Sequence, residues 1–184
     1  MPIVRMGKDS GRPELTTARW GLIPFWAKDA KIGYSTINAR AETVATKPAF
    51  REAFKRRRCL VPASGYYEWQ KRPDGQKQPH YFTSRDDSLL MFAGLWEYWK
   101  PKEGEPITSY TIIVCAPNPL CAAVHDRMPV IIDEKHWEHW LEGERDPGKL
   151  LKPAPDEALR VYQVSTAVNS PKNEGAELIA EIPA

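Results

Sequence analysis

The sequence has 184 residues, of which 42% are hydrophobic and 27% charged, as in an ordinary water-soluble globular protein. Its formal net charge of +2 is too small to indicate nucleic-acid binding without local clustering of Arg and Lys. No apolar run approaches the roughly 18 residues of a membrane-spanning helix and no signal peptide is recognisable, so we expect a cytoplasmic protein without membrane contact.

Cysteine usage excludes two further classes. Cys59, Cys115 and Cys121 are odd in number and show no zinc-ligand spacing. This argues against a disulfide framework and against a structural zinc site. We therefore expect buried thiols in a reducing compartment, with no metal and no cofactor.

Two helices are predicted between longer stretches of strand. Thr46 is expected to cap the first, which carries Pro48 in its first turn and runs to about Arg57. Asp133 is expected to cap the second, which runs through Leu141 and stops near Gly143. Predicted strands are more numerous than predicted helices, and these segments are rich in β-branched and aromatic residues. In chain order they cover Cys59–Pro62, Gly65–Gln70, His80–Ser84, Leu89–Trp99, Tyr110–Cys115, Met128–Ile132 and Arg160–Val164.

Strands and helices do not alternate regularly, which disfavours a doubly wound parallel sheet. We predict an α+β fold over residues 1–184: a single domain of curved, mainly antiparallel, barrel-like β-sheets with a few peripheral helices. The segment 71–76 contains Pro-Asp-Gly and predicts a hairpin turn between two of the strands. We expect a monomer.

Four short motifs are not required by packing. The first two are WGLIPFW at Trp20–Trp26 and INARAET at Ile37–Thr43. If the second is extended, Asn38 and Arg40 point the same way and present an amide beside a planar cation. The alternative is an Asx turn followed by a solvated arginine.

The third motif, GYYEW, places Glu68 between aromatic rings. On a strand, Tyr66 and Glu68 share one face while Tyr67 and Trp69 share the other. A carboxylate flanked by rings is partly desolvated, which raises its pKa and suits general acid/base work. The alternative is a surface glutamate on a half-solvated strand.

The fourth motif, HDRMP, begins at His125 and contains Arg127, whose guanidinium can bind a carboxylate or phosphate bidentately. The alternative for His125 is a structural histidine. His136 and His139 are spaced three apart, but no third metal ligand is apparent. The basic clusters Lys55–Arg58 and Lys71–Lys77 are either solvated faces or the lining of a shallow groove for a phosphate backbone.

In this order and spelling, the motifs resemble the SOS-response-associated peptidase (SRAP) family of abasic-site-processing proteins. The resemblance extends from about Trp20 to Ile179. It rests on WGLIPFW, INARAET, RRRCLVPASGYYEW, HDRMP and the C-terminal VNSPKNEGAELI. Five ordered blocks make chance similarity implausible.

The resemblance implies an abasic-site sensor that binds single-stranded DNA and forms a covalent crosslink through a self-processed N-terminal cysteine. The amine and thiol of that cysteine give a thiazolidine with the sugar aldehyde. By motif position, the catalytic residues match Asn38, Glu68 and His125. The DNA-binding residues match Arg40, Arg127, Trp20 and Trp69. The partner implied is single-stranded DNA containing abasic sites, and the location is the bacterial nucleoid within the cytoplasm.

One departure from the family pattern concerns the nucleophile. Residue 2 is Pro2, and the family's Cys-Gly-Arg start is expected to be missing from this sequence. Three explanations stay open: a truncated or misplaced start, a member that has lost crosslinking, and another nucleophile, for which Cys59 is nearest. The alternative functions are a non-catalytic single-stranded-DNA-binding module and a peptidase limited to self-processing.

Overall fold

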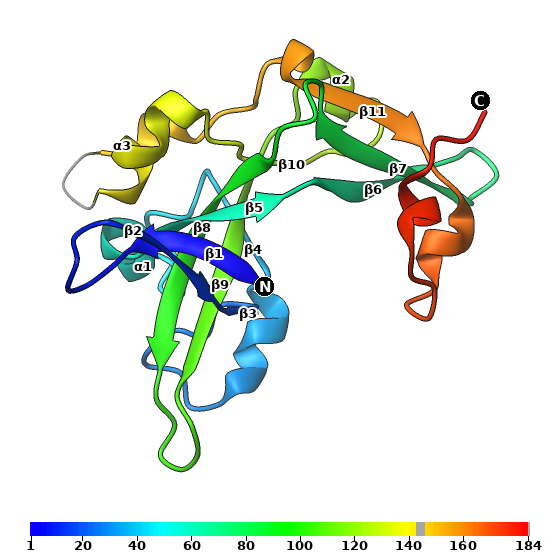
Figure 1. Ribbon diagram of the computed structural model, residues 1–184. Coiled ribbons are helices and arrows are strands. Elements are labelled where there is room, and N and C mark those ends of the chain that lie inside the picture. Colours follow the sequence, from blue (N-terminus) through cyan, green and yellow to red (C-terminus); the bar gives the residue numbers. More distant parts are fainter. Residues whose placement is uncertain (143–145, 184) are drawn as a thin grey trace. The chain divides into compact units, whose positions relative to one another are not determined.

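Figure 1 shows the computed structural model of the chain, which describes residues 1–142 and 146–183. The chain divides into two compact units. Unit 1 comprises Met1–Pro62, Met91–Cys115 and Pro129–Lys152, and unit 2 comprises Ala63–Leu90, Ala116–Met128 and Pro153–Ala184.

Unit 1 is built on a curled, half-barrel mixed sheet with the strand order β10-β9-β8-β5-β1-β2. These strands are β1 (Pro2–Met6), β2 (Pro13–Thr17), β5 (Arg58–Ala63), β8 (Leu90–Trp99), β9 (Ile107–Cys115) and β10 (Met128–Pro129). Two further strands, β3 (Arg19–Trp20) and β4 (Asn38–Arg40), pair in parallel with β9. In the same sheet, β1 pairs antiparallel with β2 and β5, and β8 pairs antiparallel with β9.

The helices of unit 1 are short. They are α1 (Arg51–Arg56), α3 (Trp137–Leu141) and the 3-10 helices Ala30–Ser35, Glu134–His136 and Gly148–Leu150. The fully buried side chains include Ile3, Leu22, Ile113 and Trp140. These come from strands, a loop and a helix, so the core ties together parts of the sequence that lie far apart.

Arg58 joins the ends of two of these helices. The residue is only 3% exposed. It donates hydrogen bonds to the carbonyl oxygens of Phe54, Lys55, Trp140 and Glu142, at the C-terminal ends of α1 and α3. Helix C-termini leave such carbonyls without intrahelical partners, so a buried cation satisfies them. The interpretation of Lys55–Arg58 as a phosphate-binding run is therefore wrong for Arg58.

Unit 2 contains a three-stranded antiparallel sheet in the order β11-β7-β6 (Figure 1). Its strands are β6 (Gly65–Lys71), β7 (Lys77–Ser84) and β11 (Leu159–Gln163). The predicted turn joins β6 to β7: Arg72 N donates to Gln76 O, and Gly75 has a φ of +82°. The short helix α2 (Pro119–Ala122) and the 3-10 helices Asp156–Ala158, Thr166–Asn169 and Ala176–Ile179 complete the unit.

The predicted α+β class and most of the predicted strands are confirmed. The first helix is shorter than predicted: Thr46 is not its cap but donates to Thr43 O, and turns that include Pro48 precede α1. Asp133 does act as a cap, because its side chain accepts from Lys135 N. The predicted stop near Gly143 lies outside the described residues. β10 is also shorter than predicted, ending at Pro129, with a single bridge from Ile131 to Phe92.

None of the helices in the described part of the chain is long and apolar enough to cross a membrane.

Candidate active site and nucleic-acid interface

The two faces of β6 carry different chemistry, as strand alternation predicts. On one face, Tyr66 stacks on Phe82 of β7, with ring centroids 4.7 Å apart. Glu68 follows on the same face, two residues along the strand. Its cross-strand partner in β7 is His80, which is buried.

Glu68 faces His125, which lies shortly after α2. Glu68 Oε2 and His125 Nε2 are 3.7 Å apart. This distance is longer than a direct hydrogen bond but within ion-pair range. Both side chains are partly exposed, at 26% for Glu68 and 37% for His125. The structure therefore brings a carboxylate and an imidazole together where a small molecule can still reach both.

Backbone groups orient the imidazole. Arg127 N lies 3.1 Å from His125 Nδ1 and donates to it. In the neutral tautomer whose Nδ1 accepts this bond, the proton is on Nε2, which faces Glu68. Two acceptors also lie close to Nδ1, Arg127 O at 3.2 Å and Asp126 Oδ1 at 3.4 Å.

The pKa of Glu68 is raised above its ordinary value, chiefly because burial disfavours the charged carboxylate. The charge of His125 and a hydrogen bond from the backbone N–H of Trp69 lower it, and Asp126 raises it. Opposite Glu68, burial lowers the pKa of His80, which favours a neutral ring there. The result is a carboxyl group that holds a proton more readily than an exposed glutamate does, beside a histidine able to exchange it.

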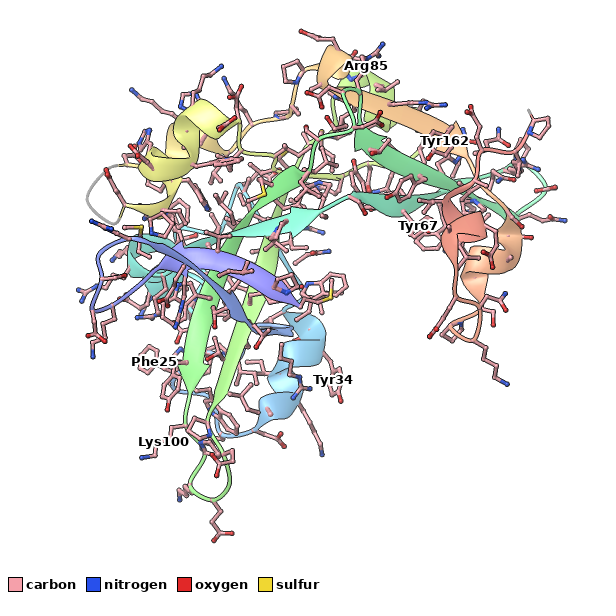
Figure 2. All side chains as sticks on the ribbon, in the orientation of Figure 1. Phe25, Tyr34, Tyr67, Arg85, Lys100 and Tyr162 are labelled. Atoms are coloured by element: carbon pink, nitrogen blue, oxygen red, sulfur yellow. The ribbon has the colours of Figure 1, made fainter. Side chains whose placement is uncertain are left out.

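The other face of β6 is aromatic. The ring centroid of Tyr67 lies 6.4 Å from that of Trp69 and 5.1 Å from that of Tyr81. The ring centroids of Tyr81 and Tyr162 are 5.8 Å apart. Figure 2 labels Tyr67 on β6 and Tyr162 on β11. Trp69 Nε1 donates to Asn169 Oδ1 at 2.7 Å. Trp69 therefore lies on the opposite face of the strand from Glu68, as the alternation predicts, with its indole N–H already occupied.

Within unit 1, Asn38 and Arg40 lie on β4 with Ala39 between them. Ala39 is fully buried while Asn38 and Arg40 are exposed. The segment is extended, which confirms that the amide and the guanidinium share a face. The Asx-turn alternative is wrong, because β4 pairs in parallel with Ile112–Val114 of β9.

Trp20 lies next to this strand. It is 48% exposed, and its Nε1 donates to Ile37 O at 2.8 Å, directly before Asn38. The bond fixes the indole while leaving much of the ring open to stacking. On the same unit, the guanidinium of Arg19 lies 5.8 Å from the ring centroid of Tyr34, which is 75% exposed and labelled in Figure 2.

Two glycines explain why the first motif can hold Trp20 there. Gly21 has a φ of +104° and its N donates to Tyr110 O. A Cβ on Gly21 would come within 2.5 Å of Gly33 O, so the chain passes too closely for any side chain. Thr36 Oγ1 then donates to Leu22 O at 2.6 Å and links this turn to the segment that enters β4.

The three cysteines are buried. Burial raises the pKa of the Cys59 thiol, so the reactive thiolate is disfavoured. Cys59 is fully inaccessible within unit 1 and is not a candidate nucleophile in this structure. In the part of the chain that the structure describes, no cluster of three His, Cys, Asp or Glu side chains has the arrangement of a metal site.

Sequence reasoning missed residues that support the site. Gln70 shares the face of Glu68, and its Nε2 donates to Ala123 O at 2.8 Å. The same alternation that paired Tyr66 with Glu68 would have included it. Asn118, before Pro119, caps α2 by accepting from Cys121 N at 2.8 Å. An Asn-Pro pair is a recognisable start of a helix, and this signal was available in the sequence.

Of the seven residues expected to act, the structure places Glu68, His125, Arg127 and Trp69 in unit 2 and Trp20, Asn38 and Arg40 in unit 1. The chain is thus an α+β protein with a partly exposed glutamate–histidine pair in unit 2 and an exposed amide, arginine and tryptophan in unit 1.

Comparison with known proteins identifies the family. The sequence profile described as SOS response associated peptidase (SRAP) matches residues 1–171. A relative in Bacillus subtilis (strain 168), named abasic site processing protein YoqW, is 44% identical over 181 residues, covering 96% of this chain and 81% of that protein. The Gallus gallus abasic site processing protein HMCES is 35% identical over 207 residues, covering 97% of this chain and 61% of that protein.

A solved structure has the same fold. The crystal structure of a protein from Bacteroides thetaiotaomicron superposes with a TM-score of 0.88 at 30% identity, covering 99% of this chain and 81% of that one. The chain therefore belongs to the SRAP family, and the resemblance seen in the motifs is confirmed.

Proposed function

We propose that this protein recognises abasic sites in single-stranded DNA and that the Glu68–His125 pair transfers protons during reaction at the sugar aldehyde. The observation that carries the proposal is the 3.7 Å approach of Glu68 Oε2 to His125 Nε2, combined with the raised pKa of Glu68. Relatives that match over most of the chain are named abasic site processing proteins, which supports the substrate class.

The DNA-binding part of the proposal concerns unit 1. Exposed Trp20 offers a face for stacking on an unpaired base, while Arg40 and Asn38 offer a cation and an amide for a phosphate or base. In unit 2, Arg127 and Trp69 are proposed to contact DNA as well. Stacking favours single strands over duplex, and phosphate contacts make the affinity fall as salt rises.

The covalent step requires an amine. An amine attacks the aldehyde carbon, the carbonyl oxygen leaves as water, and an imine remains. The departing oxygen needs a proton, which the protonated carboxyl group of Glu68 or the imidazolium of His125 is suited to supply. Closure to a thiazolidine then adds a thiol to the imine carbon, so the amine and the thiol must belong to one N-terminal cysteine.

The test is a denaturing gel with a single-stranded oligonucleotide that carries one abasic site. A matched oligonucleotide with a tetrahydrofuran analogue has the same backbone gap but no aldehyde. Borohydride reduces an imine to a stable amine, so we expect a trapped band with the first oligonucleotide only. Glu68→Gln and His125→Asn should reduce the rate of trapping, whereas Thr83→Val, elsewhere in the same sheet, should not.

The two arginines test binding separately. Arg40→Ala and Arg127→Ala should each weaken single-strand binding by about 1–3 kcal/mol, the range for a hydrogen bond to a charged group. Their melting temperatures should stay near that of the parent protein. Equal affinity for duplex and single strand would contradict the proposed recognition.

The nucleophile is tested with two polypeptides. Expressed as printed, the chain offers the amine of Met1, or of Pro2 after methionine removal, and neither residue carries a thiol. We expect adducts of this polypeptide to need borohydride. A polypeptide with an added N-terminal block beginning Met-Cys-Gly-Arg should give an adduct that survives without reduction. DNA binding without any adduct in either form would instead indicate a non-catalytic single-stranded-DNA-binding module.

A further inference from the structure

Three alternate residues of β6 contact one segment of the chain, Asn118–Arg127, hereafter the His125 segment. Tyr66 Oη lies 3.7 Å from Cys121 Sγ, Glu68 Oε2 lies 3.7 Å from His125 Nε2, and Gln70 Nε2 donates to Ala123 O at 2.8 Å. All of these residues belong to unit 2. The face of β6 that carries the acid thus also holds the segment that carries the histidine.

The beginning of the His125 segment is anchored independently of β6. Asn118, which is 5% exposed, accepts from Cys121 N and donates through Nδ2 to Ala154 O at 3.0 Å. Asp156 Oδ1 accepts from Leu120 N at 3.3 Å. These bonds fix the start of α2. Val124 N and His125 N both donate to Cys121 O at 2.9 Å, which closes the turn that leads to His125, but these bonds lie within the segment and do not hold it against β6.

Gln70 acts at this turn. Its bond to Ala123 O lies two residues before His125, between the Tyr66–Cys121 and Glu68–His125 contacts along the segment. We propose that Gln70 is a positioning residue, which holds the His125 segment against β6 so that the imidazole stays within reach of the Glu68 carboxylate. It acts through Ala123 and transfers no proton itself, because a side-chain amide does not ionise in this pH range.

The proposal predicts an electrostatic effect. His125 lowers the pKa of Glu68, so any change that lets the imidazole move away removes part of that effect. The other groups near Glu68 are Asp126 and Cys121 on the His125 segment and His80 on β7. Asp126 and Cys121 would move together with His125, so the contribution of His125 is isolated only by making His125→Asn both with and without the substitution of Gln70.

The experiment is a double-mutant cycle in which carbon-13 NMR measures the pKa of the Glu68 carboxyl group. The Glu68 resonance is assigned as the carboxyl signal that disappears in Glu68→Gln. In the parent protein, His125→Asn should raise the pKa of Glu68. Gln70→Met keeps the side-chain length and loses the donor, and it serves as the second background for the same substitution. Adding His125→Asn there should raise the pKa of Glu68 by less than about half as much. Gln70→Lys restores an N–H donor and should preserve the larger shift.

Thr83→Val is the matched control. Thr83 Oγ1 donates to Ser64 O at 2.9 Å, so this variant also removes one side-chain-to-backbone bond from a half-buried position of the same sheet. It should leave the coupling unchanged. Equal shifts in the parent and Gln70→Met backgrounds, or a loss of coupling in Thr83→Val as large as in Gln70→Met, would overturn the proposal.

A second readout rests on the proposed function. The pH dependence of borohydride trapping should shift in Gln70→Met in step with the pKa of Glu68 titrated in the same variant, while single-strand affinity stays the same. The titration uses no DNA. A decoupled titration without any trapping in the parent protein would therefore refute the proposed function and leave the positioning role in place.

Discussion

Replacing Arg58 with Met should remove a large part of the stability of unit 1. The guanidinium is buried and donates to four carbonyl oxygens, including Phe54 O at 2.9 Å and Lys55 O at 3.2 Å. Burial lowers its pKa and the nearby Asp146 raises it, and an arginine stays charged nonetheless. Methionine fills much of the same space and offers no donor.

The magnitude follows from which carbonyls lose contact with solvent. The bonds to Phe54 O and Trp140 O are buried, whereas those to Lys55 O and Glu142 O are only partly buried and can be replaced by water. Two unsatisfied buried carbonyls cost about 1–3 kcal/mol each. Removing the buried cation also removes its desolvation penalty, which offsets part of this cost. We expect a net loss of roughly 2–4 kcal/mol, against a total stability of about 5–15 kcal/mol for a typical protein.

The assay is urea unfolding followed by tryptophan fluorescence. Trp140 is a built-in reporter, because the Arg58 guanidinium lies 5.7 Å from its ring centroid. Arg58→Lys keeps the positive charge but replaces the planar guanidinium, with its several N–H donors, by a single ammonium group. The loss of stability in this variant should therefore be intermediate. Arg56→Met, two residues earlier and exposed, should change stability by no more than about 0.5 kcal/mol. A loss below about 1 kcal/mol for Arg58→Met would refute the reasoning.

Three further predictions concern pH, thiols and backbone. Burial raises the pKa of Glu68 in the folded state. The contribution of this carboxyl group to stability is therefore complete below the ordinary glutamate pKa and is lost as the pH rises through the folded-state pKa. At neutral pH, Glu68→Gln should unfold at a higher urea concentration than the parent protein, and this difference should vanish near pH 4. The raised pKa of buried Cys59 predicts no alkylation by iodoacetamide in the native protein and rapid alkylation in denaturant, as mass spectrometry would show. Gly21→Ala should lower the melting temperature more than Gly75→Ala, because both have positive φ but only Gly21 would place a Cβ 2.5 Å from Gly33 O.

Short-range patterns predicted the parts of the fold that short-range forces determine. The Pro-Asp-Gly turn and the two faces of β6 follow from local backbone preferences and from the period of a strand. The same reasoning predicted the shared face of Asn38 and Arg40, once the segment proved to be extended. These features require no knowledge of distant partners.

The features that were missed depend on distant partners. β3 and β4 have two and three residues, and their pairing with β9 joins positions about 70 or more residues apart. No local period identifies strands this short. Arg58 lies in a run of four basic residues, and the sequence gives no reason for the last to be buried while its neighbours are not. The buried carbonyls that receive it at Trp140 and Glu142 are assembled only by the tertiary fold.

The environment of Glu68 also arises at this tertiary level. A fully buried carboxyl group would have a raised pKa but could not touch a substrate, and a fully exposed one would be accessible with an ordinary pKa. Glu68 avoids both extremes because it is only partly buried. Burial raises its pKa, the imidazole of His125 partly opposes the rise, and 26% of the side chain stays exposed. The strand alone determines which way Glu68 points, whereas its chemistry depends on a segment more than 50 residues away that Gln70 is proposed to hold in place.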